Sequence, residues 1–113
     1  MKTVEKPWGS ELIWAHTNRY VGKILHIRKG EALSLQYHRV KEETIMVLTG
    51  SIVLRYESAE FSSTATLKRL DAFHIPPGLI HRMIALEDAE VLEVSTPEVD
   101  DVVRLEDRYG RAP

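Results

Sequence analysis

Two short segments of the chain carry side chains that could bind a metal ion. Gln36 and His38 are two residues apart and are followed by Glu43, while His81 comes shortly after the Pro76-Pro77-Gly78 turn. Residues two apart on a strand point to the same face, so Gln36 and His38 are expected side by side. One amide oxygen, one carboxylate and two imidazoles suit zinc, manganese, nickel or iron(II) and leave positions open for water or substrate.

Each of these residues is weak evidence when it is taken alone. A single strand histidine is more often structural than a metal ligand, and a glutamine ordinarily lies on the surface. Burial of all four side chains without a metal would cost free energy unless each found hydrogen bonds. The ordered set, rather than any one member, therefore indicates a metal site.

The elements that must position this set are short strands separated by turn residues, a pattern typical of an antiparallel sandwich or barrel. Breaks such as Lys29-Gly30 and Thr49-Gly50 supply the positive φ angles of tight reversals. The predicted strands are Glu11–Ala15, Tyr20–Arg28, Ala32–His38, Glu43–Leu48, Ser51–Tyr56, Thr64–Lys68, Ala72–Ile75, Ile80–Leu86 and Ala89–Thr96.

The last stretch, from Glu98 to Arg111, has a different pattern. Val99, Val102 and Val103 recur at helix-like spacing among charged residues, and Pro97 could open a short helix. The alternatives are an ordered arm across the barrel and a frayed terminal tail.

Length and composition restrict the class of protein. The 113 residues, 43% of them apolar and 28% charged, fit one globular domain spanning 1–113. A net charge of −2 with interspersed signs argues against a nucleic-acid partner, and the absence of cysteine excludes thiolate chemistry. No apolar run reaches membrane-spanning length and no signal peptide is seen, so we expect a cytoplasmic protein without a membrane partner.

The two metal-binding segments resemble the two motifs of the cupin superfamily. Gly30, Gln36, His38, Glu43 and Gly50 match the first motif, and Pro76, Gly78 and His81 match the second, Pro-x-Gly-x-x-His. The resemblance implies an all-β, single-domain cupin, a jelly-roll barrel or double-stranded β-helix, with a short C-terminal helix or arm.

A narrower resemblance runs nearly end to end. The Lys6-Pro7-Trp8-Gly9-Ser10 opening, the Leu33–His38 segment and the Asp100–Arg111 segment look like the C-terminal cupin domain of the type II mannose-6-phosphate isomerase/mannose-1-phosphate guanylyltransferase family. That family commonly has His-Trp and Asn where this chain has Thr44-Ile45 and Ala85, and it carries an upstream nucleotidyltransferase domain that this sequence lacks. The same four ligands bind zinc in phosphomannose isomerases, so the resemblance implies one divalent ion, with zinc preferred over manganese, nickel or iron.

The activity implied is aldose–ketose isomerisation of a sugar or sugar phosphate, in which a base moves a proton between C1 and C2. Lys41, His74 and Glu11 are candidate bases by position, although His74 could equally be a histidine on the outer face. Arg104 could clamp a phosphate, or form a salt bridge with Asp100, Asp101 or Asp107.

Two other functions remain open on the sequence alone. A metal-dependent oxygenase is one, and a non-catalytic metal- and sugar-binding module is the other, which the altered Thr44-Ile45 and Ala85 positions favour. A homodimer is also expected, because small cupins usually bury a sheet face between two copies. Leu33, Leu35, Tyr37, Trp8 and Trp14 could supply that face, or could pack within one chain.

Overall fold

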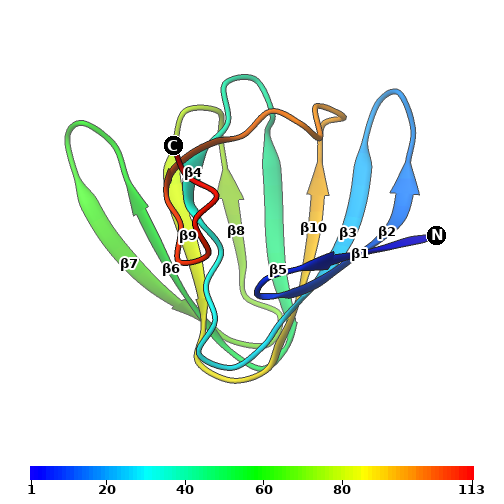
Figure 1. Ribbon diagram of the computed structural model, residues 1–113, viewed down its shortest axis with the longest axis horizontal. Coiled ribbons are helices and arrows are strands. Elements are labelled where there is room, and N and C mark those ends of the chain that lie inside the picture. Colours follow the sequence, from blue (N-terminus) through cyan, green and yellow to red (C-terminus); the bar gives the residue numbers. More distant parts are fainter.

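The computed structural model describes all 113 residues and consists of eleven strands without a helix (Figure 1). It therefore confirms the all-β class. The strands are β1 (Lys2–Lys6), β2 (Gly9–His16), β3 (Val21–Ile27), β4 (Leu35–Tyr37), β5 (Glu43–Thr49), β6 (Ile52–Glu57), β7 (Ser62–Leu67), β8 (Ala72–Ile75), β9 (Ile80–Ala85), β10 (Ala89–Ser95) and β11 (Val103–Glu106).

The strands form two antiparallel sheets that face each other. One sheet has six strands in the order β1-β2-β3-β10-β5-β8, and the other has five in the order β11-β4-β9-β6-β7. In Figure 1 the sheets converge at the lower end of the molecule and spread apart toward the upper end. The mouth of the barrel therefore lies where β4 ends and β5 begins.

All nine predicted strands are present, and the predicted Ala72–Ile75 strand matches β8 residue for residue. Two further strands, β1 and β11, were not predicted. β1 reads Lys-Thr-Val-Glu-Lys, whose single large apolar residue gives almost no alternation to detect. β11 belongs to the C-terminal stretch, where the helix alternative is wrong: residues 103–106 pair with β4, and the segment is an ordered arm.

The inward faces of the strands change character along their length. On β10, Ala89 and Val91 are fully buried near the lower end, whereas Glu93 and Ser95 occupy the same face nearer the mouth. On β9 the inward residues Ala85 and Met83 give way to His81 in the same way. The barrel thus has an apolar lower half, which forms the hydrophobic core, and a polar upper half.

Three of the residues predicted to form a dimer face are buried within the chain. Trp8, Leu33 and Leu35 are all less than a tenth exposed, so the alternative of packing inside one chain holds for them. Trp14 is 45% exposed, and its ring covers the backbone of Gly22 on the neighbouring strand β3. The homodimer itself stays a prediction. Separately, the structure contains no helix long and apolar enough to cross a membrane.

Gly30 and Gly50 form a matched pair for testing how the lower end is packed. Both have positive φ, 81° and 75°, but a Cβ on Gly50 would lie 2.2 Å from the Asp88 carbonyl oxygen, whereas one on Gly30 would meet nothing within 4 Å. We expect Gly30→Ala to cost about 1–2 kcal/mol of unfolding free energy through backbone strain. Gly50→Ala should cost a further ~1–3 kcal/mol through the clash. Urea denaturation measures both; equal losses would contradict the close approach.

Candidate metal centre

Three of the four predicted ligands come together at the mouth of the barrel. His38 directly follows β4, Glu43 begins β5 and His81 lies on β9; their exposed fractions are 3%, 3% and 1%. The Nε2 atoms of both histidines lie 3.3 Å from Glu43 Oε1. One ligand atom from each of the three residues lies within 4.8 Å of the others, a spacing that can hold one metal ion.

The hydrogen bonds of the His38 and His81 rings leave Nε2 of each ring free to bind a metal. His38 Nδ1 lies 2.6 Å from the Asp101 carbonyl oxygen, and His81 Nδ1 lies 2.9 Å from the Leu79 carbonyl oxygen. A carbonyl oxygen only accepts, so each Nδ1 carries the proton and each neutral ring presents an Nε2 lone pair toward Glu43. This is the tautomer that a metal-ligating histidine adopts.

The same atoms are the ones that lack partners. His38 Nε2 and His81 Nε2 are buried and form no hydrogen bond. Unsatisfied buried polar atoms are rare in folded proteins because each costs free energy, and a bound ion can compensate for the missing hydrogen bonds. The donor set therefore fits a divalent metal.

Gln36 lies beside this group rather than within it. It pairs with His81 across β4 and β9, and its Oε1 accepts a hydrogen bond from the Ser34 hydroxyl at 2.7 Å. A carbonyl oxygen has two lone pairs, so this bond leaves Gln36 able to coordinate. Its role as a fourth ligand stays a prediction.

The group borders a cavity of about 610 Å³ between the two sheets. Gln36 and His38 form part of its wall, and Arg104 of β11 adds a cation to the same side. The opposite wall comes from the six-stranded sheet. Six lysine and arginine residues line the cavity against three acidic ones, in a chain of net charge −2: Lys2, Lys6, Lys23, Lys41, Arg104 and Arg111 against Glu11, Glu93 and Asp100.

Lys41 connects the three clustered ligands His38, Glu43 and His81, called the metal group below, to the opposite wall of the cavity. Its buried Nζ lies 3.3 Å from Glu43 Oε2 and 3.3 Å from Glu93 Oε2. Burial opposes the charge of this ammonium group, but Glu93 and Glu43 outweigh burial and raise the pKa of Lys41 above its ordinary value. Lys41, one of the predicted site residues, is thus protonated and forms part of the cavity wall.

The two carboxylates beside Lys41 respond to their surroundings in opposite directions. Burial would raise the pKa of Glu43, but N–H groups of protonated His38 and His81 rings, together with the charge of Lys41, hold that pKa well below the usual range, and a bound cation in place of the ring protons would act in the same direction. Burial, reinforced by the Glu43 charge, raises the pKa of Glu93 to about 7. Two acidic groups in one site therefore have separated protonation equilibria.

Arg104 projects from β11 on the same face as the ligands. Its cross-strand partner is Gln36, whose own partner is His81, so the three residues form a row across β11, β4 and β9. Arg104 makes no salt bridge, and its Nε is buried without a hydrogen-bond partner. The predicted alternative of a salt bridge is absent: Asp107 instead accepts bonds from Arg111, the nearest at 2.7 Å.

His74 lies outside the site, and its prediction as a catalytic residue is corrected on this geometry. β8 pairs with β5 so that His74 stands opposite Thr44. Because Glu43 points into the barrel, Thr44 and its partner point out. The His74 side chain is 56% exposed and its Nε2 contacts Glu42 Oε2 at 2.5 Å on the surface.

Two residues of the cavity were missed as site residues, namely Lys23 and Glu93. Lys23 pairs with Glu93 in the strand register and forms a 3.4 Å ion pair with Glu11, the third base candidate, which also lines the cavity. The alternation of residues along β10 could have identified Glu93, because it puts Glu93 on the same inward face as Ala89 and Val91. A charged residue at an inward-facing position, among apolar residues of the same strand face, indicates a polar pocket.

The positions that depart from the family pattern lie away from the cavity. Thr44 faces outward, whereas Ile45 and Ala85 are buried in the hydrophobic core, and none of the three lines the cavity wall. The altered residues therefore supply no side chain to this cavity.

Comparison with known proteins places this geometry in a family. The model of the family described as mannose-6-phosphate isomerase C-terminal matches residues 1–107. The chain belongs to this family. Mannose-1-phosphate guanylyltransferase ManC of Salmonella typhimurium is 34% identical over 118 residues, which span 97% of this chain and 23% of that relative. The chain thus corresponds to about a quarter of the relative's length.

Solved structures confirm the cupin fold. KdgF from Halomonas sp. superposes with a TM-score of 0.75 at 21% identity, over 88% of this chain and 91% of its own. An RmlC-like cupin from Shewanella frigidimarina has a TM-score of 0.76 at 12% identity, over 88% and 86% of the two chains. At these identities the likeness establishes the fold alone.

We expect the purified chain to take up about one divalent ion, and the His38→Ala/His81→Ala double variant to take up none. Removing two of three clustered ligands leaves too few donors for tight binding. Elemental analysis after dialysis against each metal measures the stoichiometry. A His74→Ala variant, altered on the outer surface, is the matched control and should retain the ion. Equal metal content in the wild type and the double variant would contradict the site.

Proposed function

We propose that this domain catalyses a metal-dependent aldose–ketose isomerisation of a phosphorylated sugar. The observation that carries the proposal is that His38, one member of the buried group of His38, Glu43 and His81, lines a cavity in which cationic side chains outnumber acidic ones. The family description points to the same reaction, whereas the guanylyltransferase name of ManC refers to a protein about four times longer.

The reaction needs a polarised carbonyl and a group that moves one proton between adjacent carbons. A divalent ion, when bound, would polarise the substrate carbonyl and its neighbouring hydroxyl. Glu93 is placed to move the proton, because its carboxylate lines the cavity within 3.3 Å of Lys41, which itself contacts the metal group. Lys41 would hold Glu93 in position and balance negative charge that develops on the substrate oxygens.

Arg104 is suited to bind the phosphate. Its planar guanidinium can donate two parallel hydrogen bonds to phosphate oxygens, and it forms no ion pair with a carboxylate in the structure. Because Arg104 and Gln36 are cross-strand partners, a phosphate held there would keep the sugar beside the metal group. An unphosphorylated sugar would lose this contact.

The direct test is the interconversion of mannose 6-phosphate and fructose 6-phosphate by the metal-loaded chain, followed with a coupled assay. We expect Glu93→Gln to lower kcat by about 10²–10⁴-fold, because the amide cannot accept the proton. Glu90→Gln is the matched control on β10, since Glu90 faces outward and contacts Thr49. Unchanged turnover in Glu93→Gln would remove Glu93 from this role.

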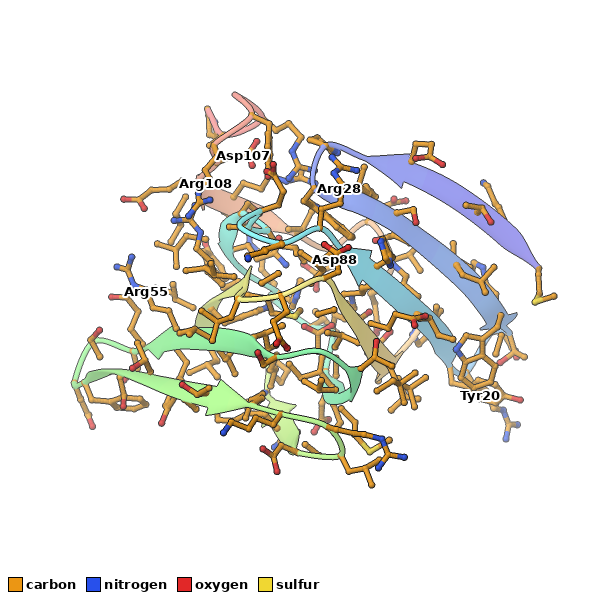
Figure 2. All side chains as sticks on the ribbon, turned by 90° about the horizontal axis from the view of Figure 1, so that it is seen from below. Tyr20, Arg28, Arg55, Asp88, Asp107 and Arg108 are labelled. Atoms are coloured by element: carbon orange, nitrogen blue, oxygen red, sulfur yellow. The ribbon has the colours of Figure 1, made fainter.

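Arg104→Ala should raise KM for the sugar phosphate about 10–100-fold, the equivalent of one charge-assisted contact. The KM of an unphosphorylated sugar should not change, since it lacks the group that Arg104 binds. Arg55→Ala is the control: Arg55 pairs with Glu57 on β6, and Figure 2 shows it projecting from the outside of the molecule. Equal KM effects on both substrates would argue against a phosphate contact.

The remaining outcomes of the same assay separate the alternative functions. Tight binding of metal and sugar phosphate without turnover would make the domain a binding module. Oxygen consumption by the iron-loaded chain, without isomerisation, would make it an oxygenase. Either result would overturn the isomerase proposal while leaving the metal group in place.

A further inference from the structure

The loop that carries the metal ligands is held by one residue of the C-terminal arm, defined here as residues 97–111. This loop joins β4 to β5, with His38 at its start and Glu43 immediately after its end. Asp101 lies 63 residues beyond His38 in the chain, yet it contacts four consecutive residues of this segment, His38 to Lys41.

The Asp101 carboxylate satisfies three backbone groups in a row. Its Oδ1 accepts from the Arg39 N–H at 3.0 Å, and its Oδ2 accepts from the N–H groups of Val40 and Lys41 at 2.7 and 2.9 Å. A loop has no ladder of its own to satisfy these donors. The carboxylate therefore takes the place of a secondary-structure partner and fixes the path of the loop.

The backbone of the same residue acts on a ligand directly. The Asp101 carbonyl oxygen accepts the His38 Nδ1–H at 2.6 Å, which sets both the tautomer and the ring orientation. Thr96 completes the junction: its N–H donates to the Glu42 carbonyl, and its hydroxyl accepts from the Glu42 N–H, both at 3.0 Å. Asp101 of the arm and Thr96, which directly precedes it, thus hold the two ends of the segment between His38 and Glu43.

We propose that Asp101 is a positioning residue for the metal centre, and that through it the C-terminal arm determines how tightly the site binds a divalent ion. The inference rests on the proposed metal site but not on the isomerase reaction. Asp101 is not a member of the ligand group. It acts by holding His38 and Glu43 at the spacing that a single ion requires.

The test compares Asp101→Asn with the wild-type chain. The amide has the same shape, but its NH₂ group cannot accept the N–H groups that the lost carboxylate oxygen accepted. We expect Kd for Zn²⁺ to rise about 10–100-fold, the usual effect of removing an outer-shell partner. Co²⁺ loaded into the variant should show a changed visible absorption spectrum, which a purely structural role would leave unaltered.

Asp88→Asn is the matched control. Asp88 also accepts a backbone N–H, that of Lys29 at 2.7 Å, but it lies in the turn before β10 at the opposite end of the barrel (Figure 2). It should lose stability without losing metal affinity. Equal Zn²⁺ affinity in Asp101→Asn and the wild type would overturn the proposal while the metal site stands. Absence of metal binding by the wild type would instead remove the proposed site itself.

A measurement on the wild type keeps the proposal testable if Asp101→Asn does not fold. In the metal-free chain, ¹⁵N NMR of the imidazoles should show the His38 proton on Nδ1, with slow exchange because the Asp101 carbonyl holds it. A proton on Nε2, or rapid exchange at Nδ1, would show that Asp101 does not fix this ring and would overturn the proposal.

Discussion

The upper half of this barrel is organised around one buried carboxylate. Glu43 is 3% exposed, and a charge removed from water must be compensated by its neighbours. The buried Lys41 ammonium lies beside it and also contacts Glu93, and the two imidazole Nε2 atoms around it can share a bound cation with it. The charges continue from Glu93 to Lys23 and from Lys23 to Glu11. Burial of Glu43 is thus accompanied by charged inward residues on β3, β10 and β2.

Because charged side chains fill the upper half of the barrel, hydrophobic stabilisation comes from the lower half. Inward residues of the lower end, such as Ile27, Val47, Ile52 and Ala89, are completely buried and belong to the hydrophobic core. The tight turn at Gly50, against the backbone of Asp88, closes that end. A strand such as β10 therefore supplies the hydrophobic core with its first half and the cavity with its second. A substitution in one half can then alter stability with little change at the site.

How much the sequence could predict follows from which interactions are local. Alternation of apolar residues located nine strands, and the two-residue spacing of Gln36 and His38 placed both on one face, because these are properties of a single strand. The outward position of His74 depends on its register with β5, a contact between distant segments. The path of the C-terminal arm depends likewise on β4, whose free edge takes β11 as a strand partner in place of helix formation. The choice of ligands, by contrast, was predictable only through the family resemblance.

In the C-terminal arm, the same strand pairing that extends the sheet also positions residues of the site. β4 has only three residues, and without β11 it would be an exposed edge. The pairing that covers this edge also sets Arg104 opposite Gln36 and delivers Asp101 to the ligand loop. Backbone hydrogen bonds from that loop hold the pKa of the Asp101 carboxyl at about 2, so it stays ionised as an acceptor. The arm is therefore a wall of the cavity as well as the strand partner of β4.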